Sequence, residues 1–245
     1  MPLYLTEADV ASLLTAADAV PVLEECCRRL AAGSVETLPR RRLAVPGGSF
    51  AVMAAADREL GYAGVKSYTV VDGRLAFAVC LFDLGSGELA AVIEADRLGQ
   101  LRTGAASGVA ASCLARSGAS SVGLIGCGRQ AQSQLEAIRA AVPTIERAVA
   151  WCRTPERLAD FCEGTRAEPA GGPADAAAQD VVVTATTSTD PVLRGDWLRE
   201  GALVCAIGAN EPRARELDNV VLQRASFVCC DLLEQARLES GDLIE

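Results

Sequence analysis

The sequence predicts an α/β fold made of two domains, an α+β domain over residues 1–103 and a parallel-sheet domain over residues 104–245. In the second part, short apolar strands alternate with helical stretches, which indicates a parallel sheet with helical crossovers. Over residues 43–93, short β-type runs are separated by glycine-containing turns instead. This part therefore predicts a mostly antiparallel sheet.

Length and composition limit the classes of protein that the chain can represent. Its 245 residues, 50% of them hydrophobic, suffice for one large domain or two modest ones. No apolar run approaches the roughly 20 residues of a membrane-spanning helix, and the N-terminus lacks the features of a secretory signal, so we expect a cytoplasmic protein. The net charge of −9 disfavours a nucleic-acid partner, although Arg40, Arg41 and Arg42 could form a small anion site.

Cysteine and histidine usage bears on both metals and catalysis. None of the ten cysteines has the CxxC spacing of zinc sites, and the chain contains no histidine, so no metal site is predicted. Most cysteines have apolar neighbours, and we interpret them as small buried residues in a reducing compartment. Without an imidazole, acid–base catalysis must use Lys, Asp, Glu, Tyr, Cys or water.

Two helices are expected before the N-terminal sheet. Thr6 is a typical N-cap for the first. The second is predicted to begin near Asp18, with Pro21 in its opening turn, and to end at Gly33. Its expected core residues are Val20, Leu23, Cys27 and Leu30. The sheet itself is predicted from four runs, at residues 50–53, 64–71, 76–82 and 89–93.

The C-terminal domain is expected to open with an alanine-rich helix over residues 104–116. The later helices are predicted from Gln130 and over residues 155–162, and residues 164–178 are expected to form a surface connection. The predicted strands cover residues 121–125, 148–151, 180–185, 202–207 and 226–230.

The most specific local pattern is a strand that leads into G-x-G-x-x-A and then a helix. Gly126 permits the tight turn, Gly128 lets the backbone approach a pyrophosphate, and Ala131 permits close packing of helix on strand. The N-terminus of the following helix supplies N–H groups for the phosphates. The pattern predicts a Rossmann-type dinucleotide-binding domain, with a glycine-rich turn that binds nothing as the alternative.

The residues after the second strand of this domain predict which nicotinamide cofactor is used. An acidic residue that would bind the ribose 2′-hydroxyl of NAD is absent there, and Arg153 and Thr154 follow the strand instead. Arg153 can pair with a 2′-phosphate, so NADP(H) is predicted over NAD(H), which stays possible. Thr186 and Gly208 lie at the ends of later strands, where they can contact ribose and nicotinamide or serve only in turns.

Taken together, these segments resemble the ornithine cyclodeaminase/mu-crystallin family. The matching segments are residues 39–43, 64–66, 81–83, 101–107, the Gly126 loop, 215–218 and 239–242. The resemblance implies a homodimer whose N-terminal domain binds substrate and makes the dimer contact, and whose second domain holds NAD(P)(H). It implies interconversion of amino and imino acids, with the substrate carboxylate bound by Arg40, Lys66 and Arg102; Arg42 is the alternative register for Arg40. The predicted cofactor-binding residues are Thr103, Gly126, Gly128, Arg129, Gln130, Ala131, Arg153, Thr154, Thr186 and Gly208.

Two departures from the family pattern affect the expected reaction. Asn210 stands where cyclodeaminases and alanine dehydrogenases of the family have an aspartate, and an amide cannot act as a general base. Family members also continue past Gly241-Asp242, so a C-terminal return segment is expected to be missing. We therefore expect an NAD(P)H-dependent reductase of a small α-imino acid, such as Δ1-pyrroline-2-carboxylate. The alternatives are an ornithine cyclodeaminase, which forms proline and releases ammonia, and a non-catalytic NADPH-binding protein.

Overall fold

The computed structural model describes residues 1–244 and divides the chain into two compact units. The first covers Met1–Arg102, and the second begins at Thr103. The helix α3 (Asp96–Leu114) contains this boundary. No helix in the described part of the chain is both long and apolar enough to span a membrane.

The first unit is built on a six-stranded sheet with the order β1-β6-β5-β4-β3-β2. All neighbouring strands are antiparallel except β1 and β6, which confirms the predicted mostly antiparallel sheet. Asp72 and Gly73 both have positive φ, as the turn between β4 and β5 requires. The strands are β1 (Leu3–Leu5), β2 (Val35–Val45), β3 (Gly48–Asp57), β4 (Tyr62–Val71), β5 (Arg74–Asp83) and β6 (Leu89–Glu94).

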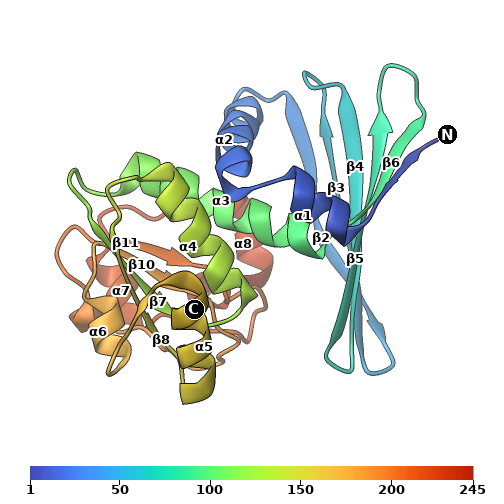
Figure 1. Ribbon diagram of the computed structural model, residues 1–245. Coiled ribbons are helices and arrows are strands. Elements are labelled where there is room, and N and C mark those ends of the chain that lie inside the picture. Colours follow the sequence, from blue (N-terminus) through green and yellow to red (C-terminus); the bar gives the residue numbers. More distant parts are fainter. Residues whose placement is uncertain (245) are drawn as a thin grey trace. The chain divides into compact units, whose positions relative to one another are not determined.

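Two helices, α1 (Glu7–Leu13) and α2 (Ala16–Ala31), precede most of this sheet and lie on one side of it (Figure 1). Thr6 caps α1 as predicted, and Thr15 caps α2 through a reciprocal capping box with Asp18. Because Thr15 starts α2 earlier than expected, Pro21 lies inside the helix and not in its opening turn. Cys27, expected in the core, is exposed.

The second unit contains a five-stranded, entirely parallel sheet with the order β11-β10-β7-β8-β9. Counted from its first strand, this order is 5-4-1-2-3, which is that of a Rossmann sheet. After β7, β8 and β9, the next strands β10 and β11 are added on the other side of β7, so the strand order reverses between β7 and β10. The predicted parallel sheet is therefore confirmed. The strands are β7 (Ser121–Ile125), β8 (Arg147–Trp151), β9 (Glu168–Pro169), β10 (Val181–Thr184) and β11 (Leu203–Ala206).

Helices cover both faces of the parallel sheet (Figure 1). On one face, Leu124 and Val183 pack with residues of α3, α4 (Arg129–Ala141) and α5 (Pro155–Thr165). On the other, Ile125 and Val182 pack with residues of α6 and α7. The remaining helices are α6 (Pro173–Ala177), the 3₁₀ helix η1 (Gly195–Trp197), α7 (Asn219–Arg224), α8 (Leu233–Glu239) and α9 (Gly241–Ile244).

Several sequence predictions for this unit were wrong. The helix expected over 104–116 begins at Asp96, and residues 164–178 contain β9 and the buried part of α6 instead of being a plain surface connection. Residues 226–230 form no strand, because they are exposed and pair with no neighbour in the sheet. The cysteines are not generally buried: Cys205 is, but Cys27, Cys113, Cys229 and Cys230 are exposed.

Candidate functional site

Two arginines of the first unit, Arg40 and Arg102, lie near Lys66 on β4. Arg40 lies on β2 where the register between β2 and β3 shifts, and Arg102 lies on α3. Lys66 Nζ is 5.5 Å from the centroid of the Tyr68 ring, and the Arg40 guanidinium is 5.9 Å from it. Both cations therefore share an aromatic neighbour, which favours them electrostatically.

Helix α3 also lies close to the ammonium group of Lys66. A Cβ placed on Gly99 would lie 3.7 Å from Lys66 Nζ, so the lysine reaches the helix surface where no side chain stands. Asp96 and Arg102 are each three residues from Gly99 and share its face of the helix. The lysine thus has one acidic and one basic neighbour on α3.

Burial and charge together change the acidity of Lys66. Desolvation, followed by the positive charges of Arg102 and Arg40, lowers the pKa of Lys66 from 10.5 to about 8, and Asp96 opposes this only in part. A group of three neighbouring cations favours a bound anion. A carboxylate suits it, because a guanidinium can bind both carboxylate oxygens.

Apolar and aromatic side chains surround this cation cluster of Arg40, Lys66 and Arg102. Tyr68 and Phe77 stack with their ring centroids 5.0 Å apart, and Phe77 lies 5.2 Å from Lys66 Nζ. Met53 on β3 and Val79 on β5 are the cross-strand partners of Lys66. An anion held here would therefore have an uncharged, apolar group beside its carboxylate.

The glycine-rich turn of the second unit has the features that a dinucleotide requires. Gly126 has φ +116°, and a Cβ there would lie 2.4 Å from the Ala185 carbonyl oxygen, so only glycine is accommodated. Gly128 is the N-cap of α4 and provides no side-chain cap, and a Cβ on it would meet nothing within 4 Å. The space beside Gly128 is therefore open at the start of α4, where the first N–H groups of a helix can bind phosphates. Ala131 is fully buried beneath the turn.

Arg153 is the second residue after β8 and is exposed. Among residues 1–244, no hydrogen bond or ion pair engages its guanidinium group. Thr154 is the N-cap of α5, but its side chain makes no capping hydrogen bond. Both polar groups remain available to a ligand next to the glycine-rich turn, since Ile125 and Trp151 are paired at the ends of β7 and β8.

Glu216, to which the sequence assigned no role, links Thr186 and Gly208 through hydrogen bonds. Thr186 and Gly208 lie beyond the ends of β10 and β11. The Thr186 N–H donates to Oε1 of Glu216 at 2.6 Å, and the Gly208 N–H donates to Oε2 at 2.7 Å. Glu216 is fully buried. The only sequence signal was its place in the segment 215–218, which carried part of the family resemblance.

The predicted site residues thus form two groups, each within one unit. Arg40, Lys66 and Arg102 come together in the first. Thr103 follows Arg102 on α3, and Asn210 lies in the exposed loop after β11, where its N–H donates to the Gly208 carbonyl at 2.9 Å. The residues at the C-terminal ends of the parallel strands are Gly126, Gly128, Arg129, Gln130, Ala131, Arg153, Thr154, Thr186 and Gly208.

Comparison with known proteins identifies relatives along the whole described chain. The model of the ornithine cyclodeaminase/mu-crystallin family matches residues 2–244. Δ1-Pyrroline-2-carboxylate reductase of Paracoccus denitrificans is 32% identical over 92% of this chain and 74% of its own length.

Two solved structures resemble this one closely. An archaeal alanine dehydrogenase dimer with bound NAD superimposes with a TM-score of 0.91 and 34% identity, covering 98% of this chain and 77% of that one. Thermococcus litoralis Δ1-pyrroline-2-carboxylate reductase, in complex with NADH and L-proline, has a TM-score of 0.91 and 28% identity, covering 99% and 79%.

Proposed function

Since the chain belongs to the ornithine cyclodeaminase/mu-crystallin family, we propose that it is an NAD(P)H-dependent reductase of small α-imino acids. A cyclic ketimine such as Δ1-pyrroline-2-carboxylate is the expected substrate, and the cyclic amino acid is the product. The observation that carries the proposal is the cation cluster of Arg40, Lys66 and Arg102 with its apolar surroundings. It suits a molecule with one carboxylate and no charged side chain.

In the proposed reaction, reduction of the imine carbon would use a hydride that the nicotinamide cofactor would supply when bound, and the imine nitrogen would gain one proton. Arg40 and Arg102 bind the carboxylate and orient the carbon that is reduced. Lys66, with a pKa of about 8, is protonated at neutral pH yet close enough to titration to give its proton to the nitrogen. The neutral side-chain amine of Lys66 then recovers a proton from water.

The cofactor is proposed to bind along the C-terminal ends of the parallel strands. Gly126, Gly128 and the start of α4 would hold the pyrophosphate, and Thr186 and Gly208 the nicotinamide side. The exposed Arg153 supports a preference for NADP(H), because its guanidinium can bind a ribose 2′-phosphate. The solved relatives named above contain NAD or NADH, so both cofactors enter the test.

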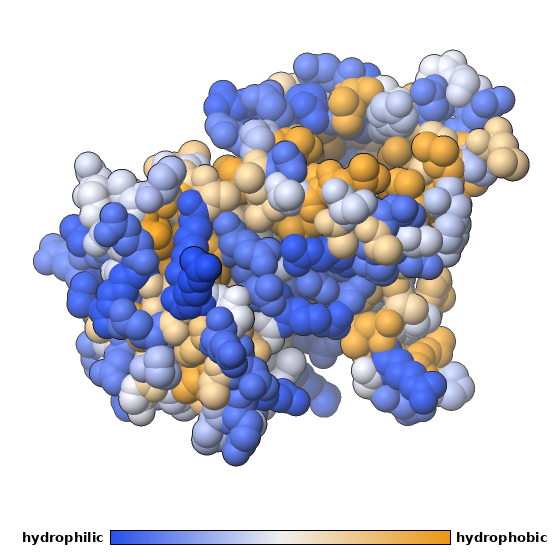
Figure 2. All heavy atoms as spheres, in the orientation of Figure 1, coloured by the Kyte–Doolittle hydropathy of each residue, from blue (hydrophilic) through white to orange (hydrophobic). Residues whose placement is uncertain are grey.

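We also propose a homodimer that forms through the first unit. Figure 2 shows hydrophobic side chains exposed over this unit. On the sheet face opposite Lys66, Leu38 and Leu43 are each 62% exposed, and Val65 and Phe82 are 36% exposed. Exposed apolar surface of this kind is typical of a subunit contact. Sedimentation at micromolar concentration is expected to give the mass of two chains.

The reductase proposal is tested with two measurements on the purified protein. A fluorescence titration with NADPH and with NADH is expected to show saturable binding. Oxidation of the bound cofactor with Δ1-pyrroline-2-carboxylate is then expected, with proline as product. Arg102→Ala is expected to retain cofactor binding and to lose most turnover. Release of ammonia from ornithine without net cofactor consumption would favour a cyclodeaminase, and binding without any turnover would favour a binding protein.

A further inference from the structure

Glu216 accepts hydrogen bonds at both carboxylate oxygens, from two different strand ends. Oε1 accepts from the Thr186 N–H at 2.6 Å. Oε2 accepts from the Gly208 N–H at 2.7 Å and from the Thr184 hydroxyl at 2.8 Å. Thr184 is the last residue of β10, and Gly208 follows β11. One buried side chain therefore ties the ends of two adjacent strands to each other.

The backbone of Glu216 is itself held in place. Oδ1 of Asp242 accepts from the N–H groups of Glu216 and Leu217, each at 2.8 Å. The Glu216 carbonyl accepts from the N–H groups of Val192 and Leu193 at 2.8 and 2.9 Å. These contacts fix the carboxylate against the sheet, so it can set the position of the groups that it binds.

Close packing extends this arrangement to the glycine-rich turn. A Cβ on Gly208 would lie 2.6 Å from Cδ of Glu216, so the carboxylate sits directly on that glycine. A Cβ on Gly126 would lie 3.3 Å from Cγ2 of Thr186. Glu216, Thr186 and Gly126 are thus in contiguous contact, and a displacement of Thr186 would change the floor of the proposed cofactor site.

We propose that Glu216 is a positioning residue, which holds Thr186 and Gly208 where the nicotinamide riboside half of the cofactor binds. This inference rests on the cofactor site proposed above. Both Glu216 oxygens must accept, because two backbone N–H groups approach them separately. Glutamine has one accepting oxygen, so its amide group would face one of these N–H groups and displace it.

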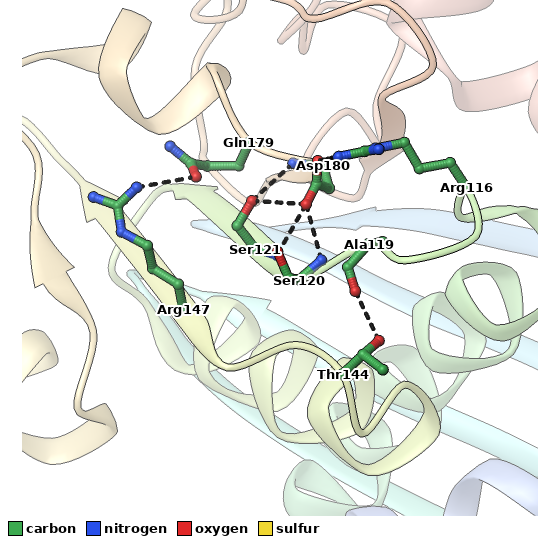
Figure 3. Close-up of polar contacts among 8 residues, drawn as sticks. All are labelled: Arg116, Ala119, Ser120, Ser121, Thr144, Arg147, Gln179 and Asp180. Carbon is green, nitrogen blue, oxygen red and sulfur yellow. Dashed lines mark hydrogen bonds and ion pairs between the residues drawn. The ribbon is translucent and has the colours of Figure 1, made fainter.

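Asp180 provides a matched control at the other end of β10. It precedes Val181 and is also a buried carboxylate that accepts two backbone N–H groups, from Ser120 at 2.9 Å and Ser121 at 3.1 Å (Figure 3). It lies at the N-terminal edge of the sheet, away from the strand ends where the cofactor is proposed to bind. Loss of its charge should affect folding without changing that site.

The experiment compares wild type, Glu216→Gln and Asp180→Asn by titration with two ligands. One is the reduced dinucleotide that wild type binds more tightly, and the other is its adenosine fragment, 2′,5′-ADP for NADPH or ADP for NADH. Glu216→Gln is expected to raise the Kd of the dinucleotide about tenfold or more and to leave that of the fragment within about twofold. Asp180→Asn is expected to lower the Tm and to change neither Kd.

An unchanged dinucleotide Kd in folded Glu216→Gln would overturn the inference, as would equal weakening of both ligands. If wild type bound neither dinucleotide, the proposed function would fail first, and this inference with it. If Glu216→Gln did not fold, amide NMR of wild type would decide. The Thr186 and Gly208 resonances are expected to shift with the dinucleotide and not with the adenosine fragment; shifts that are alike for both ligands would overturn the inference.

Discussion

The ammonium group of Lys66 lies 5.2 Å from the centroid of the Phe77 ring, on the strand adjacent to its own. An aromatic ring at this distance stabilises the positive charge of the ammonium group. However, burial removes water from the ammonium group, and two guanidinium groups lie nearby. The result is a pKa lowered to about 8. Lys66 is thus charged at neutral pH at a cost to the folded state, which agrees with the role in proton transfer that we propose for it.

Replacing Lys66 with methionine is expected to stabilise the ligand-free protein. A pKa lowered from 10.5 to about 8 corresponds to about 1–3 kcal/mol of penalty for the charged form at pH 7. Because the unfolded lysine stays protonated up to pH 10.5, wild type regains this stability as pH rises above 8, and the difference between the proteins shrinks. Urea unfolding at pH 7 and pH 9.5 measures both effects.

The control for this variant is Arg28→Met, in which an exposed cation on α2 is lost. Its effect on the free energy of unfolding is expected to stay within about 0.5 kcal/mol. If Lys66→Met were no more stable than wild type at pH 7, the assigned cost of burying the ammonium would be wrong. Catalytic turnover is expected to be lost in Lys66→Met and retained in Arg28→Met.

The pH dependence of kcat/KM is expected to show a basic limb near pH 8, where Lys66 loses its proton. Arg102→Gln removes one of the positive charges that lower this pKa. The limb of its residual activity should therefore move to higher pH, by up to about one unit. A limb that stays in place, or moves to lower pH, would show that another group controls it. Rate measurements from pH 6 to pH 10 are sufficient.

The sequence predicted the parallel sheet because its strands are buried on both faces and read as short apolar runs. It did not predict β2, because Pro39 and three arginines interrupt the apolar alternation of that strand. The start of α3 at Asp96 was also missed, since Gly99 weakens the helical pattern before the alanine-rich stretch.

Glu216 shows why part of the candidate site could not be predicted. Its partners Thr184 and Thr186 are 32 and 30 residues distant in the sequence, and Asp242 is 26 residues distant. Contacts between residues so distant in the sequence produce no local periodic pattern from which they could be predicted. The glycine-rich turn, in contrast, is a local feature of the chain, so the spacing of its glycines was enough to assign its residues to one loop.

Arg153→Ala is expected to reduce the affinity for NADPH about tenfold and to leave that for NADH within about twofold. The guanidinium would pair with the 2′-phosphate, which only NADPH carries, and the loss of one such pair corresponds to about 1.4 kcal/mol. Arg199→Ala is the control, because this arginine is also exposed but lies before β11. Equal losses for both cofactors would contradict the assigned role of Arg153.

Gly128 and Gly126 are expected to respond differently to alanine. A methyl group on Gly128 meets nothing within 4 Å, so Gly128→Ala should cost less than about 1 kcal/mol of stability and weaken cofactor binding at least tenfold. At Gly126, with φ +116°, the same change should cost about 2 kcal/mol or more. Thermal unfolding and cofactor titration separate the two effects. Unchanged binding in Gly128→Ala would place the phosphates elsewhere.

Asp180 is expected to make stability depend on pH in the acid range. Burial alone would raise its pKa, but hydrogen bonds from Ser120, Arg116 and Ser121 outweigh this and lower it from 3.8 to about 2. The folded protein therefore holds the carboxylate more firmly ionised than the unfolded chain does. Its contribution of about 2 kcal/mol is complete above pH 4 and is lost as pH falls from 4 to 2.

Asp180→Asn removes this contribution at neutral pH. It should unfold more easily than wild type at pH 6, and the difference should narrow steadily below pH 4. Urea unfolding at several pH values gives both curves. A difference that stayed constant down to pH 2 would mean that the asparagine variant loses packing or a hydrogen bond, and not the charge that binds the Ser120 and Ser121 N–H groups (Figure 3).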